Sequence, residues 1–144
     1  MTDVGGMAHL SISRSEAETA ALGAHLAASL PAGGVVLLIG DLGAGKTSFV
    51  RGMATGLGVD PDEVSSPTFT LIQVYRGART IYHVDLYRLE SLEVDDLGLE
   101  ELAAEGGAVV AIEWAEKLPR PFPGAIEVRI EDLGEDSRRI TLST

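Results

Sequence analysis

The sequence predicts an α/β fold with a mainly parallel central sheet, flanked by helices and extended by antiparallel strands. Two continuous apolar runs carry this prediction, one at Val35–Ile39 and one at residues 108–112. Neither run alternates apolar with polar residues, which is typical of strands that are covered on both faces in a parallel sheet. Segments with helical spacing separate the strands, as α/β folds require.

The first helix is predicted by its start and stop signals. Ser15 and Glu18 form a capping-box pattern ahead of leucines that recur every four residues. This pattern predicts an amphipathic helix that ends near Pro31 and Gly33. A second helical run follows at residues 48–57.

The second half of the chain completes the alternation of strands and helices. Residues 69–75 and 81–86 are predicted to be strands joined by a turn, residues 95–105 a helix, and residues 125–130 and 138–142 a terminal hairpin around Gly134. The hairpin and the paired strands supply the antiparallel additions to the sheet.

Residues 40–47 read GDLGAGKT, a complete G-x-x-x-x-G-K-[ST] phosphate loop. The loop follows the strand at Val35–Ile39 and precedes a helix, so backbone N–H groups and a helix N-terminus converge on one phosphate. We expect Lys46 to contact the β- and γ-phosphates of ATP and the Thr47 hydroxyl to ligate Mg²⁺. The alternative is a glycine turn with a structural lysine, but the flanking strand and helix favour a P-loop NTPase. The other loop residues expected to line the nucleotide are Asp41, Leu42, Gly43, Ala44 and Gly45.

Length and composition narrow the class of protein. The 144 residues suit a single domain at residues 11–144 behind a flexible lead-in at residues 1–10. Cysteine is absent, which excludes disulfides, a thiolate metal site and a cysteine nucleophile. The apolar runs are too short to span a bilayer, and the N-terminus lacks the layout of a signal peptide. We therefore expect a cytoplasmic protein that has no membrane partner.

The charge balance bears on the partners. The formal net charge is −11, with 22 acidic against 11 basic residues and only two lysines. Proteins that grip nucleic acid use clusters of Lys and Arg, so this chain is not expected to bind nucleic acid alone. A basic protein partner is one interpretation of the acidic surface, and ordinary solubility is the other.

Three residues stand where the sheet should deliver a ligand site. In open α/β sheets, ligands bind beyond the carboxyl ends of the strands. Glu113 closes one apolar run and Asp85 closes another, so both are candidates for binding metal or orienting water. Thr68, on a loop stiffened by proline, is a candidate contact to the γ-phosphate or the metal. The alternatives are a surface acid for Glu113 and a turn-forming aspartate for Asp85.

Four motifs together resemble one family. They are GDLGAGKT at 40–47, SPTFTL at 66–71, HVDLYR at 83–88 and IEW at 112–114. Their order and spacing over residues 11–142 are similar to those of the bacterial TsaE family, formerly called YjeE. The resemblance implies a small ATPase needed for the N6-threonylcarbamoyl modification of adenosine 37 in tRNAs that read ANN codons. It also implies that TsaB and TsaD are partners, that TsaD transfers the threonylcarbamoyl group, and that tRNA is reached only through the complex.

The resemblance assigns roles to individual residues. By position, it implies that Lys46 and Thr47 hold phosphate and Mg²⁺ and that Glu113 is the second metal ligand. It further implies that Asp85 is required for hydrolysis and that Trp114 lies beside the nucleotide. A core or interface anchor is the alternative for Trp114.

Several further side chains each have a functional and a structural interpretation. Ser48 stands where many relatives have a threonine, and its hydroxyl still reaches the α-phosphate region. By resemblance Arg139 or Arg138 approaches the nucleotide, and a solvent-exposed strand arginine is the alternative. For Arg88, a salt bridge is preferred over a charge-stabilising role. His83 is interpreted as a packed or hydrogen-bonded strand residue rather than a base.

Three other functions are open to a chain with a phosphate loop. A GTPase requires an Asn-Lys-x-Asp segment, and the chain contains no asparagine. A small-molecule kinase of P-loop fold usually adds lid arginines and an acceptor-binding insert, whereas the arginines here are scattered. A nucleotide-gated interaction module without significant turnover differs from an ATPase only in whether Glu113 and Asp85 support hydrolysis.

Overall fold

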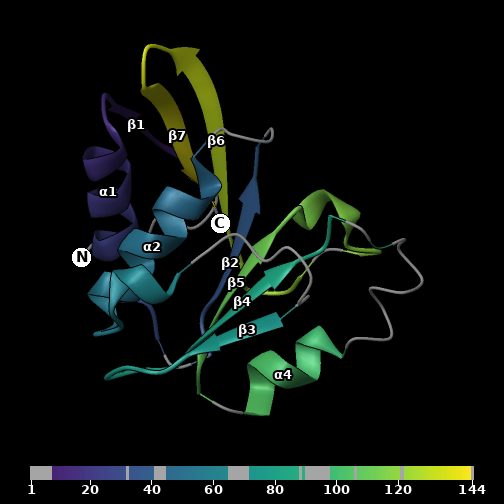
Figure 1. Cartoon of the computed structure of the whole chain (residues 1–144). Coiled ribbons are helices and arrows are strands. Elements are labelled where there is room, and N and C mark those ends of the chain that lie inside the picture. Colours follow the sequence, from purple (N-terminus) through teal and green to yellow (C-terminus); the bar gives the residue numbers. More distant parts are fainter. Residues whose placement is uncertain are drawn as a thin grey trace.

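The computed structural model describes residues 8–31, 33–40, 45–64, 72–87, 89, 98–105, 107–120 and 122–143. The strands are β1 (Ala8–Ser13), β2 (Val35–Ile39), β3 (Ile72–Tyr75), β4 (Ile81–Asp85), β5 (Val109–Glu113), β6 (Ile126–Gly134) and β7 (Ser137–Ser143). The helices are α1 (Glu16–Ser29), α2 (Lys46–Gly56) and α4 (Leu99–Glu105), with short 3₁₀ helices η1 (Pro61–Glu63) and η2 (Ala115–Lys117) (Figure 1).

The strands of the described ranges form one mixed sheet in the order β1-β7-β6-β2-β5-β4-β3. β2 lies in the middle and pairs in parallel with β5 and β6, and β4 pairs in parallel with β5. β3 adds antiparallel to β4, while β7 and then β1 add antiparallel beyond β6. The predicted fold class, a mainly parallel centre with antiparallel additions, is confirmed, and so is the terminal hairpin.

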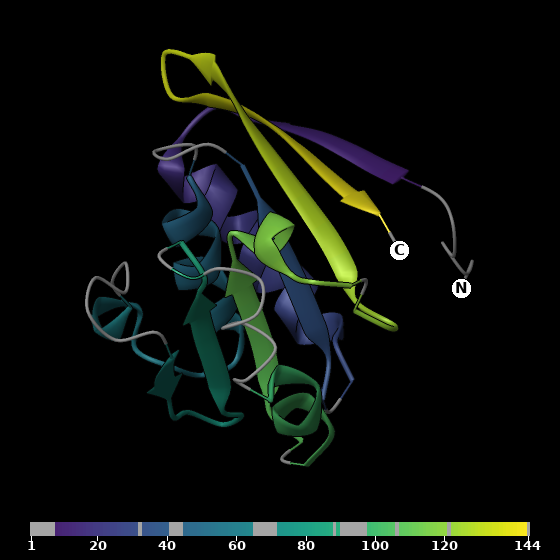
Figure 2. The same ribbon diagram turned by 90° about the vertical axis from the view of Figure 1, so that its right-hand side faces the viewer.

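Helices cover the two faces of the sheet unequally. α1 and α2 lie side by side on one face, and α4 lies on the other (Figures 1 and 2). The larger apolar cluster includes Phe49 of α2 and Leu38 of β2, and the smaller one includes Leu99 of α4 and Ile112 of β5. Because successive residues of β2 and β5 enter opposite clusters, both strands read as unbroken apolar runs. Within the described residues, no helix combines the length and the apolar character needed to cross a bilayer.

The capping box that predicts α1 is present. The Ser15 side chain accepts a hydrogen bond from the Glu18 backbone N–H at 3.1 Å, and the Glu18 carboxylate accepts one from the Arg14 N–H at 2.7 Å. These contacts satisfy N–H groups at the helix start that have no partner within the helix. The helix ends at Ser29, close to the predicted stop.

The chain begins its sheet earlier than the sequence suggests. Residues 8–10, expected in the lead-in, belong to β1, which pairs with β7. β1 does alternate apolar and polar residues, but Ser13 is the fully buried one, whereas Leu10 is 61 % exposed. The serine hydroxyl is accommodated by hydrogen bonds to Thr19 and to the Ser15 carbonyl. Residues 1–7, and residues 69–71 and 95–97 of other predicted elements, lie outside the described part of the chain.

Candidate active site

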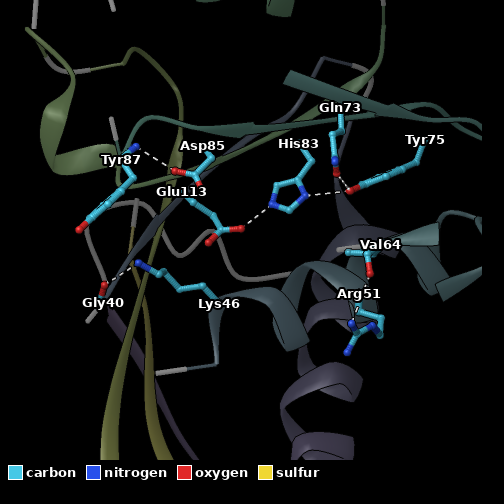
Figure 3. Close-up of polar contacts among 10 residues, drawn as sticks. All are labelled: Gly40, Lys46, Arg51, Val64, Gln73, Tyr75, His83, Asp85, Tyr87 and Glu113. Atoms are coloured by element: carbon cyan, nitrogen blue, oxygen red, sulfur yellow. Dashed lines mark hydrogen bonds and ion pairs between the residues drawn. The ribbon is translucent and has the colours of Figure 1, made fainter. Parts of the chain in front are cut away.

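Three predicted site residues meet at one edge of the sheet (Figure 3). β2, β5 and β4 are parallel, so their carboxyl ends lie together. The register pairs Leu38 of β2 with Glu113 of β5, and Glu113 with Asp85 of β4. Gly40 follows β2 at this edge, and α2 begins at Lys46. The topology therefore brings Lys46, Asp85 and Glu113 to one place, as the position of each at an element end predicts.

Lys46 holds a positive charge away from water. It is the first residue of α2, and only 4 % of its surface is exposed. Its ammonium donates a hydrogen bond to the Gly40 carbonyl at 2.7 Å and lies 3.8 Å from the centroid of the Trp114 ring. Gly45 caps the helix at φ 108°, a left-handed conformation that other residues rarely adopt. A buried ammonium at a helix N-terminus makes this edge of the sheet attractive to anions.

Glu113 is a buried carboxylate with a fixed partner. It is 3 % exposed, and its Oε2 lies 2.5 Å from Nε2 of His83. His83 is itself fully buried, and its Nδ1 lies 3.1 Å from the Tyr75 hydroxyl. The interpretation of His83 as a packed, hydrogen-bonded strand residue is confirmed, and Glu113 is not the exposed surface acid of the alternative interpretation.

Asp85 is half-buried beside these groups. Its Oδ1 accepts a hydrogen bond from the Tyr87 backbone N–H at 2.8 Å, which forms a local turn. Burial raises the pKa of the Asp85 carboxyl above 3.8. The Tyr87 N–H lowers the pKa in part, the charge of Glu113 raises it, and His83 and Lys46 lower it. The charges of Lys46 and Glu113 therefore both act on the Asp85 carboxyl.

Trp114 borders the site in an unusual backbone conformation. It follows Glu113 directly, with φ 59° and ψ 42° in the left-handed region. For a bulky residue this conformation is an outlier that the surrounding structure must hold in place. The ring centroid lies 4.8 Å from that of Tyr87, and the Lys46 ammonium lies over the ring. Trp114 thus contacts the phosphate-loop lysine directly.

Thr47 and Glu113 carry the oxygen atoms that Mg²⁺ prefers. Thr47 follows Lys46 in the first turn of α2, and Glu113 ends β5. Mg²⁺ commonly takes one or two protein ligands and completes its shell with phosphate oxygens and water. Within the described ranges, no three His, Asp or Glu side chains gather closely enough to hold a metal ion by themselves. This donor set fits a magnesium ion that is shared with a bound nucleotide.

Comparison with known proteins identifies the family. The family model described as "Threonylcarbamoyl adenosine biosynthesis protein TsaE" matches residues 13–140. The chain belongs to the TsaE family. The tRNA threonylcarbamoyladenosine biosynthesis protein TsaE of Treponema pallidum (strain Nichols) is 43 % identical over 134 residues, which cover 92 % of this chain and 98 % of the relative. That of Bacillus subtilis (strain 168) is 43 % identical over 128 residues, 88 % of this chain and 79 % of the relative.

A solved structure agrees with this assignment. The crystal structure of Bacillus subtilis YdiB matches with a TM-score of 0.71 and 35 % sequence identity, covering 94 % of this chain and 84 % of that chain. The resemblance to TsaE drawn from the four sequence motifs is therefore confirmed. TsaE proteins take part in tRNA threonylcarbamoyladenosine biosynthesis, as the names of the relatives state.

In this TsaE chain, Arg138 rather than Arg139 lies against the phosphate loop. A Cβ added to Gly45 would lie 3.4 Å from Nε of Arg138, whose side chain is 15 % exposed. Adjacent strand residues point to opposite faces, so Arg139 faces away. Its side chain is 43 % exposed and lies 3.6 Å from Glu131. Of the two arginines considered from the sequence, Arg138 is the one that borders Gly45.

Some predicted positions lie outside the described residues. These are Asp41, Leu42, Gly43, Ala44 and Thr68, together with Arg88. Ser48 is described and lies with Thr47 in the first turn of α2.

Sequence reasoning missed the contacts behind Glu113. Tyr75 and Gln73 were assigned only to a strand, yet the Tyr75 hydroxyl contacts both Gln73 and His83. The signal lies in the register of the β3–β4 pair, which sets Gln73 opposite His83 and Tyr75 opposite Ile81 on one face. That register depends on the turn between the two strands, which the residue pattern alone does not specify.

Proposed function

We propose that this chain is a Mg²⁺-dependent ATPase that supports N6-threonylcarbamoylation of adenosine 37 in tRNA, together with TsaB and TsaD. The observation that carries the proposal is the meeting of Lys46, Asp85 and Glu113 at the end of the phosphate-loop strand. A complete phosphate loop alone indicates nucleotide binding. Two carboxylates delivered to the same edge add groups that can serve hydrolysis.

Nucleotide binding is assigned to the start of α2. Lys46 would hold the terminal phosphates, because its ammonium is already buried at the helix N-terminus and points to the end of β2. The charge of the phosphates would replace the Gly40 carbonyl as its partner, and charge-assisted contacts of this kind are the stronger ones. Arg138, which borders Gly45, is placed to add a second positive charge on the β7 side.

Hydrolysis is assigned to the two acids. The Thr47 hydroxyl and the Glu113 carboxylate would hold Mg²⁺, which when bound neutralises charge on the phosphates. Asp85 would orient the attacking water. Burial raises the pKa of Asp85, which suits a group that exchanges a proton near the reaction. Trp114 would shield the Lys46 side of the site from water.

The role in the pathway is assigned through partners. With a net charge of −11, the chain itself offers few of the cations that tRNA binding needs. Contact with tRNA is therefore assigned to the partner proteins. As the family resemblance implies, TsaD would transfer the threonylcarbamoyl group, and ATP hydrolysis in this chain would drive a conformational change in the complex. A small-molecule kinase and a nucleotide-gated module without turnover are the two alternatives that the experiment must exclude.

The proposal is tested in a reconstituted tRNA modification assay with TsaB and TsaD, with and without this chain. We expect repeated rounds of modification only when the chain and ATP are both present, and a single round or less with a non-hydrolysable ATP analogue. Glu113→Gln should behave like the analogue, since it keeps the shape of the side chain but removes its charge. Multiple rounds with the analogue would support the gated module, and phosphate transfer to a small molecule would support the kinase.

A further inference from the structure

A row of buried polar side chains lies directly behind Glu113. Figure 3 shows this row crossing three neighbouring strands of the sheet. Gln73 and Tyr75 come from β3, His83 from β4 and Glu113 from β5. The Tyr75 hydroxyl donates to the Gln73 side-chain oxygen and lies 3.1 Å from Nδ1 of His83, and Nε2 of His83 lies 2.5 Å from Glu113. All of these side chains lie on the sheet face that α1 and α2 cover.

Both nitrogens of the His83 ring have a partner. Nδ1 faces a hydroxyl, and Nε2 faces a carboxylate oxygen. In a fully buried position, any other ring orientation would leave one of these polar atoms without a hydrogen bond, which is unfavourable because no water is there to replace it. The His83 ring is therefore held in one orientation, in which Nε2 faces Glu113.

The held ring also restricts the glutamate. A glutamate side chain has several rotatable bonds, and the contact to His83 fixes one of its two oxygens. The other oxygen points away from His83, toward the side on which the Lys46 ammonium lies (Figure 3). This second oxygen is the one turned toward the side on which a metal ion or a water molecule at the nucleotide would lie.

We propose that His83, held by Tyr75, is a positioning residue that fixes one oxygen of Glu113 and presents the other to the nucleotide side of the site. The inference rests on the proposed ATP hydrolysis and extends it to residues outside the phosphate loop. Partners of metal-binding side chains typically change metal affinity or activity by about 10- to 100-fold when they are replaced. His83 would act through Glu113 without touching the substrate.

A purely structural role is the competing account. His83 fills a fully buried place, so its loss would weaken packing wherever it stood. Val84 provides the matched control, because it is the next residue of β4, is also fully buried and faces the α4 cluster instead. Val84→Ala is expected to destabilise the protein while leaving ATP hydrolysis by the folded fraction unchanged.

Two substitutions of His83 separate contact from packing. Glutamine carries its amide nitrogen about as far from the backbone as histidine carries Nε2, so His83→Gln retains a donor for Glu113. Asparagine ends near the position of Nδ1, so His83→Asn keeps the Tyr75 side and loses the Glu113 contact. Tyr75→Phe removes only the hydroxyl that orients the ring and keeps the aromatic packing.

The experiment measures kcat and KM for ATP and the Mg²⁺ concentration that half-saturates the Trp114 fluorescence response to ATP. For His83→Asn we expect kcat to fall about 10- to 100-fold and the Mg²⁺ requirement to rise about tenfold, with KM changed less than about threefold. His83→Gln should recover most of both losses, and Tyr75→Phe should show a smaller loss in the same direction.

Two results would overturn the inference. One is a folded His83→Asn protein with the parental kcat and Mg²⁺ requirement. The other is an equal loss in His83→Asn, His83→Gln and Val84→Ala, which would mark a packing effect. If neither the parent nor Val84→Ala hydrolyses ATP, the proposed function fails. The Mg²⁺ titration of nucleotide binding still tests the positioning of Glu113 in that case, because it needs no turnover.

Discussion

At the scale of single residues, Lys46 stands out because it is a buried cation. Its ammonium is buried, contacts the Gly40 carbonyl and the Trp114 ring, and interacts electrostatically with the Asp85 carboxyl. A phosphate at the start of α2 would supply full negative charge. We therefore expect a phosphate group to be attracted to this position.

Lys46→Ala should weaken ATP binding by at least about tenfold. A charge-assisted hydrogen bond is worth about 1.5–3 kcal/mol, and about 1.4 kcal/mol corresponds to a factor of ten in affinity. Titration calorimetry measures the change, and Arg129→Ala on exposed β6 is the control for an equal change in net charge. Equal affinities for the parent and Lys46→Ala would remove the nucleotide from this site.

Asp85→Asn should raise the melting temperature of the nucleotide-free protein at pH 7. Burial raises the pKa of Asp85, so the folded chain keeps a proton that the unfolded chain has released. Stability therefore falls as the pH rises through the window between 3.8 and the raised value, and it stays lower above that window. The asparagine removes this loss and can still accept the Tyr87 N–H bond.

Thermal unfolding of the Asp85 pair across pH 3 to 8 checks this sign. The advantage of Asp85→Asn should be largest at neutral pH and should shrink toward pH 3, where the parental carboxyl is protonated in both states. A lower melting temperature for Asp85→Asn at pH 7 would mean that attraction to Lys46 and His83 outweighs burial.

The candidate site shows what the sequence can predict at this scale. Glu113 and Asp85 were predictable because each ends an apolar run, and strand ends of a parallel sheet converge. The partnership of Tyr75 and His83 was not predictable, because it depends on the register between two strands. Arg138 was not separated from Arg139 for a similar reason, since a shift of one residue exchanges the two faces of β7.

At the scale of elements, the crossing of α1 and α2 depends on glycine. A Cβ added at Gly52 would lie 1.8 Å from the carbonyl oxygen of Ala20, and one at Gly23 would lie 2.2 Å from the carbonyl oxygen of Phe49. The two helices therefore approach closely enough for backbone contact. This close approach seats α2, and with it Lys46, against the sheet.

Gly52→Ala should destabilise the protein by about 1–3 kcal/mol. The gain of about 1 kcal/mol in helix propensity is outweighed by the clash with Ala20, which only a shift of backbone can relieve. Urea unfolding measures the difference. Thr55→Ala, on the exposed side of the same helix, is the control and should stay within about 0.5 kcal/mol of the parent. A Gly52→Ala protein as stable as the parent would contradict the close crossing.

The elements themselves were mostly predictable, and the exception is informative. A capping box followed by leucines at helical spacing predicted α1 correctly. Apolar runs bounded by glycine predicted β2 and β5 correctly. β1 was missed because its outward residues are the apolar ones, so its pattern gives no inward face. Its place in the sheet comes from backbone pairing with β7, which no local pattern in residues 8–13 reports.

At the scale of the whole molecule, the acidic net charge contrasts with the buried ammonium of Lys46 at the start of α2. The net charge of −11 opposes the approach of tRNA, while the start of α2 offers local positive charge to a nucleotide. These charges favour a small phosphate ligand at the start of α2, and contact with tRNA through partner proteins.

The isolated chain should therefore bind tRNA only weakly, with a dissociation constant above about 10⁻⁴ M at physiological salt. A filter-binding or fluorescence anisotropy titration with unmodified tRNA measures the affinity, and the same titration in the presence of TsaB and TsaD provides the comparison. Micromolar binding by the chain alone would assign it a direct contact with tRNA.

Glu113 and the phosphate loop are proposed to form one ATP-hydrolysing site, and the rate of phosphate release is the decisive measurement for this proposal. We would measure release from ATP with Mg²⁺ by the parent and by Glu113→Gln, each alone and with TsaB and TsaD. The parent should be slow alone and faster with the partners. At saturating Mg²⁺, Glu113→Gln should bind ATP as the parent does and release phosphate about 10²- to 10⁴-fold more slowly. Release by Glu113→Gln at the parental rate would contradict the account.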